Sequence, residues 1–286
     1  MADNIIPKII HYCWFGGNSL PELAQKCIAS WKKYCPNYQI IEWNESNFDI
    51  NLSEYTKGAY KEKKWAFVSD YARFWILYQF GGIYMDTDVE LIKPIDDLIR
   101  KGAYMGCEPV LQDTKGNDRL AGLKYFVNPG LGIAAPAHHP FYKKVLECYN
   151  ARNFYNAMGE IDLTTVVHTT TILLKKYGYG DSCKPERIFD IIIYPVDYFC
   201  PMNYFTGEIH MTSNTRSIHH YTASWHSEEE RKQMKLLQKF NLLFGKRIGH
   251  RIWRVYTLPS RVKHKIQILG LNGTVHFALE KLRNRG

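Results

Sequence analysis

Short apolar runs and helix-length segments alternate in the first part of the chain. The apolar run at residues 9–14 ends at Gly16-Gly17, which is typical of a buried strand that opens into a loop. Residues 21–34 then predict a helix, and residues 38–43 predict a second strand. The chain is therefore expected to begin with a strand, a helix and another strand.

A longer apolar segment follows and ends in a pair of glycines. Residues 65–80 are apolar on nearly every side and stop at Gly81-Gly82, which suits the end of a largely buried helix. Residues 83–85 form an apolar strand that leads directly into Asp86-Thr87-Asp88. Residues 89–92 are expected to continue in extended form.

Strand and helix patterns keep alternating toward residue 226. Further strands are predicted over residues 103–107, 131–135, 191–194 and 216–221, and further helices over residues 140–150 and 164–177. The alternation favours an α/β architecture, a mixed sheet with flanking helices, over a helix bundle or an all-β fold. The sequence shows no internal repeat and no low-complexity linker.

The overall composition is that of a globular protein. The chain has 286 residues, of which 45% are hydrophobic and 23% charged, and it nowhere holds about 18 consecutive apolar residues. The opening residues lack a basic leader and a cleavage site, so we expect no secretory route. Seven cysteines without a Cys-x-x-Cys pair favour reduced thiols and a cytoplasmic location over disulfides or structural zinc.

Positive charge is concentrated at the C-terminal end. Residues 227–286 hold fourteen Lys or Arg and four Glu, a net of +10, which leaves residues 1–226 with 23 basic and 24 acidic residues, about −1. We therefore expect two regions, a catalytic or binding domain at 1–226 and a basic helical extension at 227–286.

The basic extension has an amphipathic pattern. Ile248, Ile252 and Tyr256 recur at helical spacing, the arginines lie largely on another face, and Trp253 adds an aromatic side chain of the kind found at membrane interfaces. The pattern indicates a helix lying in the plane of an anionic membrane surface, although a solvated charged face would look the same. No nucleic-acid motif is recognisable, so no nucleic-acid partner is expected.

The Asp86-Thr87-Asp88 segment is the first candidate site. In an extended segment these two carboxylates point to the same face, where they could hold Mg²⁺ or Mn²⁺ together with substrate phosphates. A polar turn is the plain alternative. The preceding helix, glycine pair and apolar strand place the carboxylates at the carboxyl edge of a sheet, where α/β proteins bind ligands.

Two charged residues interrupt the apolar segment at 65–80. Asp70 and Arg73 are three positions apart and share one helix face. Burying them is costly unless they pair with each other or meet a polar ligand. They could therefore form an internal ion pair or face a pocket that grips sugar hydroxyls.

Three motifs together resemble one enzyme family. PKIIHYCWFGG at residues 7–17, SDYAR at 69–73 and YQFGGIYMDTD at 78–88 resemble the DXD-motif sugar transferases of glycosyltransferase family 32. That group includes capsular polysaccharide enzymes and yeast-type mannosyltransferases, and it is similar at these motifs to the clostridial glucosylating toxins. The resemblance resumes at IHHYTASW, residues 218–225.

The resemblance implies a fold and an activity. It implies a Rossmann-like GT-A fold, a divalent cation (Mn²⁺ or Mg²⁺) and a nucleotide-diphosphate sugar donor, with a UDP-sugar expected rather than a GDP-sugar. It also implies transfer of a hexose or N-acetylhexosamine with retention of configuration. The expected acceptor is a saccharide or lipid-linked saccharide in surface polysaccharide synthesis, with the enzyme cytoplasmic or peripheral on the inner face of the cell membrane.

The resemblance also implies residue roles. Trp14 would contact the base, Asp70 and Arg73 would hold the sugar, and Tyr84 would line the pocket. Asp86 would bridge ribose and metal, and Asp88 would ligate the metal.

Roles implied for the later residues are less closely tied to the three motifs. His220 is the predicted metal or phosphate contact, with His219 second because strand neighbours face opposite ways. Ser224 and Trp225 would close over the diphosphate, and Asn128 would lie near the sugar.

Two other functions remain open from the sequence. A metal-dependent phosphodiester hydrolase could use the same Asp86 and Asp88 pair. A non-catalytic carbohydrate-binding protein would show no metal-dependent nucleotide binding.

Overall fold

A computed structural model describes most of the chain. It covers residues 5–110, 120–156, 158–181, 184–222 and 228–259, and the single residues 266 and 270. The chain divides into two compact units, the first made of residues 1–202 and 209–225 and the second of residues 203–208 and 226–286.

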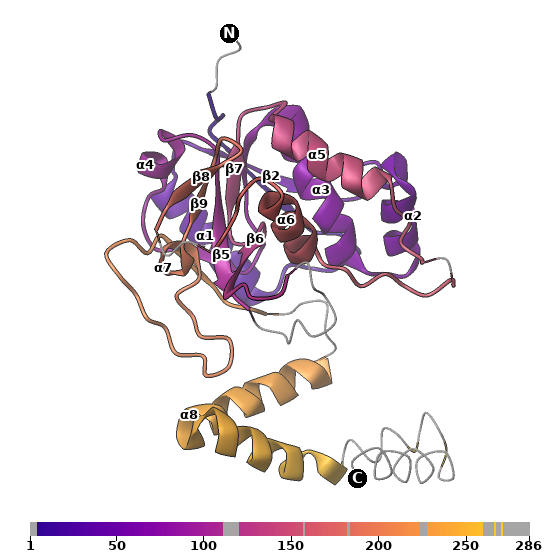
Figure 1. Cartoon of the computed structure of the whole chain (residues 1–286), viewed down its shortest axis with the longest axis vertical. Coiled ribbons are helices and arrows are strands. Elements are labelled where there is room, and N and C mark those ends of the chain that lie inside the picture. Colours follow the sequence, from indigo (N-terminus) through magenta and orange to yellow (C-terminus); the bar gives the residue numbers. More distant parts are fainter. Residues whose placement is uncertain are drawn as a thin grey trace. The chain divides into compact units, whose positions relative to one another are not determined.

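The first unit is built on a mixed eight-stranded sheet with the order β2-β1-β3-β7-β5-β9-β8, and β6 also pairs with β5 (Figure 1). Its strands are β1 (Ile9–Cys13), β2 (Gln39–Trp43), β3 (Gly82–Tyr84), β5 (Tyr104–Pro109), β6 (Tyr125–Asn128), β7 (Ile133–Ala135), β8 (Glu186–Ile188) and β9 (Ile191–Tyr194). Strands β2, β1 and β3 are parallel, whereas β7 runs antiparallel to both β3 and β5. A separate antiparallel pair joins β4 (Val89–Leu91) to β10 (Ser217–His219).

Helices cover both faces of this sheet. They are α1 (Glu22–Tyr34), a 3₁₀ turn (Ile50–Leu52), α2 (Glu54–Lys61), α3 (Trp65–Phe80), α4 (Asp96–Ile99), α5 (Pro140–Asn150), α6 (Val166–Lys175) and α7 (Val196–Phe199). Figure 1 shows α2, α3, α5 and α6 on one side of the strands and α1, α4 and α7 on the other. The α/β sandwich predicted from the alternating pattern is confirmed.

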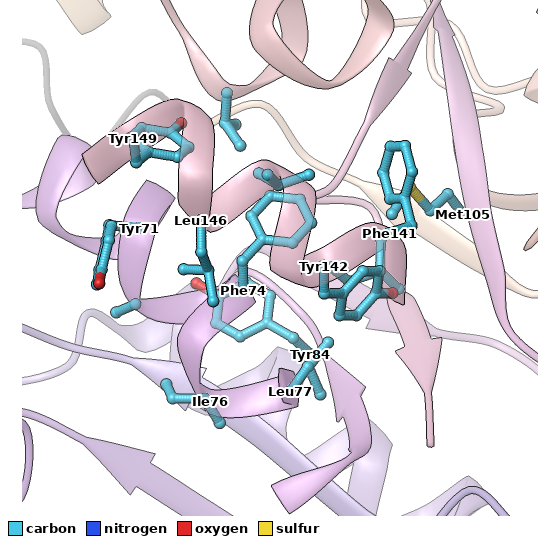
Figure 2. Packing of buried hydrophobic residues seen from close by; sticks show 14 of the residues in the cluster. Tyr71, Phe74, Ile76, Leu77, Tyr84, Met105, Phe141, Tyr142, Leu146 and Tyr149 are labelled. Carbon is cyan, nitrogen blue, oxygen red and sulfur yellow. The ribbon is translucent and has the colours of Figure 1, made fainter. Parts of the chain in front are cut away.

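Strand alternation divides the core into two hydrophobic layers. Ile83 faces the layer that contains α1, while its neighbour Tyr84 faces the layer of α3 and α5. In the second layer Phe74 of α3 meets Tyr142 of α5 edge to face, with ring centroids 5.2 Å apart (Figure 2). This contact packs α3 against α5.

The end of α3 is held tightly against β1. Gly81 has a φ of 64°, and a Cβ on Gly82 would lie 2.7 Å from the carbonyl oxygen of Ile9. His11 Nε2 donates to the Gly81 carbonyl at 3.0 Å, and His11 Nδ1 accepts from Trp43 Nε1 at 3.0 Å. Burial lowers the pKa of His11 to about 4, and the neutral imidazole is the form that makes both bonds.

Some predicted elements differ from the structure. The segment at residues 85–88 is a turn and not an extended strand, since the Val89 N–H donates to the Asp86 carbonyl at 3.0 Å. The strand predicted at 216–221 is shorter, and Tyr221 beyond it has a φ of 49°. The elements β6, β8, α2, α4, α7 and the 3₁₀ turn were not predicted.

The second unit contains one long helical segment, α8 (Glu228–Tyr256), interrupted at Gly245 with a φ of 74° and a ψ of 156°. The two arms contact each other, since Trp253 Nε1 donates to the Gln233 carbonyl at 3.2 Å. Trp253 therefore faces the other arm, whereas the sequence analysis assigned it to a membrane interface. Within the described residues, no helix is both long and apolar enough to span a membrane.

Candidate functional site

The candidate site lies where β1 and β3 end at the same edge of the sheet. Asp86, Thr87 and Asp88 form a turn between β3 and β4. The turn is fixed by backbone bonds from Met85 N–H to the His11 carbonyl and from Asp86 N–H to the Gly130 carbonyl, each 3.1 Å long. Parallel strands that end together create the kind of edge where α/β proteins place ligands.

Three potential metal ligands meet at this turn. Ligand atoms of Asp86, Asp88 and His219 all lie within 4.8 Å of one another. Because β10 pairs antiparallel with β4, His219 lies opposite Val89, one residue beyond Asp88. Two ligands on one octahedral Mg²⁺ or Mn²⁺ lie at most about 4.2 Å apart, so the three residues fit such an ion after a small adjustment.

The Asp88 carboxylate is held in place on both oxygens. Oδ2 accepts from the backbone N–H and the hydroxyl of Thr222, each at 2.8 Å. Oδ1 lies 3.3 Å from His219 Nε2.

These contacts set the charge of the pair. Burial alone would raise the pKa of Asp88, but His219 and Thr222 lower it below its ordinary value. Burial alone would lower the pKa of His219, but Asp88 raises it well above its ordinary value. A divalent cation would therefore compete with a proton for the His219 nitrogen.

The sequence analysis named His220 as the metal or phosphate contact and His219 as the second choice, and the structure brings His219 to the carboxylates. His220 Nε2 lies 2.8 Å from Glu90 Oε2 and outside the Asp86 and Asp88 pair. Its backbone N–H donates to the Asp88 carbonyl at 3.0 Å, while its side chain is engaged with Glu90. The two histidines do face opposite ways, but it is His219 that faces Asp88.

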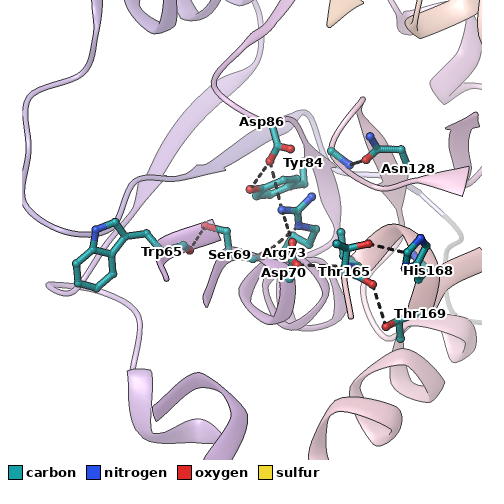
Figure 3. Close-up of polar contacts among 12 residues, drawn as sticks. Trp65, Ser69, Asp70, Arg73, Tyr84, Asp86, Asn128, Thr165, His168 and Thr169 are labelled. Atoms are coloured by element: carbon teal, nitrogen blue, oxygen red, sulfur yellow. Dashed lines mark hydrogen bonds and ion pairs between the residues drawn. The ribbon is translucent and has the colours of Figure 1, made fainter. Parts of the chain in front are cut away.

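The charged pair on α3 reaches the same turn (Figure 3). Arg73 Nη2 lies 3.0 Å from Asp70 Oδ1 and 3.4 Å from Asp86 Oδ1. Tyr84 donates its hydroxyl to Asp86 Oδ1 at 3.0 Å, and its ring packs 4.8 Å from the guanidinium. The internal ion pair, one of the two alternatives considered above, is therefore present, and its arginine also contacts Asp86 of the turn.

Burial determines which of these groups can meet a ligand. The Asp86 side chain is 30% exposed, whereas the Arg73 side chain is 4% exposed and lies beneath it. Burial would lower the pKa of Arg73, but Asp86 and its other neighbours raise it above its ordinary value, so the guanidinium stays charged. Burial raises the pKa of Asp70 to about 6.

A second set of contacts supports Asp86 from the side of β5 and β6. Asn128 Nδ2 donates to Glu108 Oε2 at 2.8 Å, and Asn128 Oδ1 accepts from the Gly130 N–H at 2.7 Å. A Cβ on Gly130 would lie only 2.1 Å from Asp86 Oδ2, so the carboxylate occupies the space that a side chain would need. Asn128 thus holds Gly130 in place, and Gly130 in turn lies against the Asp86 carboxylate.

The remaining predicted residues have different outcomes. Trp14 directly follows β1 at the same sheet edge, and its Nε1 donates to the Asn18 carbonyl at 2.6 Å. Ser224 and Trp225 lie outside the described residues. The sequence analysis assigned no role to Glu108 or Thr222. The only signal for Thr222 was its place within the late motif IHHYTASW.

Comparisons with known proteins agree with these motifs. The family described as a glycosyltransferase sugar-binding region containing a DXD motif matches residues 21–104. An uncharacterized glycosyltransferase, L373, of Acanthamoeba polyphaga mimivirus is 31% identical over 213 residues, covering 71% of this chain and 76% of the relative.

Other relatives match over shorter stretches. Inositol phosphoceramide mannosyltransferase 1 of Schizosaccharomyces pombe is 30% identical over 118 residues, covering 37% of this chain. The chain spans 35% of the length of that protein and 29% of mannosyltransferase 3 of the same yeast.

Among solved structures, the PaToxG glycosyltransferase aligns with a TM-score of 0.44 and 18% identity, covering 60% of this chain and 70% of that one. A glycosyltransferase involved in glycosylation of the major capsid of PBCV-1 aligns with a TM-score of 0.41 and 13% identity, covering 80% and 100%. The extended match to the mimivirus protein shows that this chain belongs to the glycosyltransferases whose sugar-binding region contains a DXD motif.

Proposed function

We propose that the chain transfers a hexose or N-acetylhexosamine from a nucleotide-diphosphate sugar to a saccharide or lipid-linked acceptor. The observation that carries the proposal is the meeting of Asp86, Asp88 and His219 at the sheet edge, with Arg73 and Asp70 directly beneath. This combination supplies ligands for a cation beside a buried charge pair that can orient a sugar.

The acidic turn is the proposed metal and diphosphate site. Asp86, Asp88 and His219 would hold Mn²⁺ or Mg²⁺, which when bound would stabilise negative charge on the departing diphosphate. Thr222 fixes the Asp88 carboxylate through Oδ2, so Oδ1 is already turned toward His219 and need not reorganise. Such a preset arrangement lowers the barrier more than a mobile one.

The α3 pair is the proposed sugar-orienting element. Arg73 stays ionised and anchors Asp86 and Asp70 from below, so loss of either contact would shift the exposed carboxylate. Tyr84, with its hydroxyl on Asp86, limits the rotation of that side chain further. We propose that Arg73 and Asp70, which are both nearly buried, orient the sugar by fixing the more exposed Asp86 carboxylate above them.

We propose that transfer retains the anomeric configuration by substitution on one face of the sugar. The bond from the acceptor oxygen to the anomeric carbon forms as the bond from that carbon to the phosphate oxygen breaks. The acceptor hydroxyl proton passes to the departing phosphate oxygen. This step balances without an enzymatic nucleophile.

The donor and acceptor are proposed as classes. A uridine diphosphate sugar is our first choice of donor. The yeast relatives are named for transferring mannose to inositol phosphoceramide, so GDP-mannose belongs in the test. We also propose a cytoplasmic location at the inner face of the cell membrane, where a lipid-linked acceptor for surface polysaccharide would be met.

A donor-turnover screen tests this function. The chain is incubated with Mn²⁺ and a panel of UDP-hexoses, UDP-N-acetylhexosamines and GDP-mannose, beside Asp88→Asn and the exposed control Asp190→Asn. We expect turnover of one donor that a chelator and Asp88→Asn abolish and Asp190→Asn preserves. If every donor stays intact in the folded wild-type protein, with or without saccharide acceptors, the proposal fails.

A further inference from the structure

The bend of α8 exposes apolar side chains. Leu242, Leu243 and Phe244 end the first arm and are 54%, 72% and 48% exposed. Ile248, just inside the second arm, is 57% exposed. We call these four side chains the hairpin tip.

Packing inside the second unit leaves the tip outside. Asn241 is buried, and its Nδ2 donates to the Phe205 carbonyl at 3.0 Å. Gly249 lies so close to Phe240 that a Cβ would be 2.5 Å from its carbonyl oxygen. Since the inward positions at the bend are Asn241 and Gly249, the apolar side chains of the hairpin tip do not contribute to packing between the arms.

The helical segment that carries the hairpin tip holds charge of one sign. The segment from Arg231 to Pro259 contains eight Lys or Arg and no Asp or Glu. Lys239, Lys246 and Arg247 are exposed beside the tip. An apolar patch surrounded by basic side chains fits an anionic lipid surface, whereas pairing two copies through this patch would bring like charges together.

We propose that the hairpin tip docks on an anionic lipid bilayer. Its four apolar side chains would enter the interfacial region while Lys246 and Arg247 face headgroup phosphates. The inference deepens the membrane location proposed above, but it involves the second unit alone and does not require turnover.

Vesicle flotation with the full chain tests the docking site. Vesicles of phosphatidylcholine alone are compared with vesicles that include phosphatidylglycerol. We expect binding to the anionic vesicles that weakens in high salt. The double variant Leu242→Ser/Leu243→Ser should bind about tenfold more weakly, and so should Lys246→Gln/Arg247→Gln.

Controls separate docking from folding and from catalysis. Met211→Ser removes an apolar side chain of the first unit that is 63% exposed, and it should bind vesicles like wild type. Circular dichroism and donor turnover in solution should be unchanged in all variants. Absence of turnover in the wild-type chain would count against the enzyme proposal and not against docking.

Three outcomes would overturn the inference. One is the absence of binding to anionic vesicles by the folded wild-type chain. Another is equal binding by wild type and the Leu242→Ser/Leu243→Ser variant. The last is a wild-type dimer that this variant converts to a monomer with vesicle binding unchanged, which would identify the patch as a contact between copies.

Discussion

Gly130→Ala should disable the acidic turn while leaving the fold intact. Gly130 does not have a positive φ, so its backbone can accept alanine. The added Cβ would lie 2.1 Å from Asp86 Oδ2, whereas ordinary contact begins at 3.4 Å, so the carboxylate must retreat by about 1.3 Å. The substitution thus moves a proposed metal ligand without changing its chemistry.

The expected loss follows from that displacement. A misplacement of about 1 Å at a reacting centre can cost about 10²-fold in rate, or about 2.7 kcal/mol of barrier. Because the Asp86 side chain is 30% exposed, it can rotate outward, and we expect a stability loss of only about 1 kcal/mol. Activity should therefore fall far more than stability.

Steady-state donor turnover, Mn²⁺ affinity and thermal unfolding measure the two effects. Gly180→Ala is the matched control, since the nearest atom to its new Cβ would be 3.8 Å away and its φ is not positive. It should resemble wild type in every measurement. If Gly130→Ala retains kcat/KM and Mn²⁺ affinity within threefold of the control, the proposed dependence on Asp86 placement is refuted.

Three further predictions test neighbouring contacts. His219→Ala should weaken Mn²⁺ binding and turnover by about 10²-fold, whereas His220→Ala should stay within about threefold, as measured by metal titration and donor turnover. Glu108→Ala should lower kcat about tenfold because it leaves the Asn128 amide unpaired, whereas Glu108→Gln keeps an acceptor and should stay near wild type. His11 has a pKa of about 4 in the folded protein against an ordinary value of 6.5. Its contribution of about 3 kcal/mol to the free energy of unfolding is therefore present above pH 6.5 and lost as the pH falls through 4. Denaturant unfolding across this range should show this loss in wild type and not in His11→Gln.

Each of these has a contrary result. Equal losses of Mn²⁺ binding and turnover in His219→Ala and His220→Ala would mean that the register between β10 and β4 does not decide which histidine binds the metal. A Glu108→Gln variant as slow as Glu108→Ala would show that the negative charge matters and not the hydrogen bond. An unfolding free energy of His11→Gln with the same pH dependence as wild type would show that His11 is not the group responsible.

The long apolar elements were predictable because local pattern and tertiary role agree in them. The helix at Trp65–Phe80 is apolar on most sides and ends at glycines that the strand packing requires, so its predicted bounds match the structure. β6 and β8 are short, and β8 has no buried position, so they carry little pattern of their own. Their pairing depends on neighbours distant in sequence.

The candidate site was only partly predictable because its geometry also depends on contacts between residues that are distant in sequence. Asp86 and Asp88 stand out because they follow an apolar strand, but their convergence comes from a turn and from the long-range bond to Gly130. The choice of histidine depended on the register between β10 and β4, which no local pattern reveals. The role of Glu108 depends on the pairing of β5 with β6, which brings its side chain to Asn128.

Calorimetry of UDP and GDP binding in the presence and absence of Mn²⁺ tests the central claim most directly. If the acidic turn is a metal-held diphosphate site, at least one nucleotide binds wild type only with Mn²⁺, and Asp88→Asn loses that binding while unfolding at an unchanged temperature. Nucleotide binding that persists in a chelator, or that Asp88→Asn retains in full, would contradict the account.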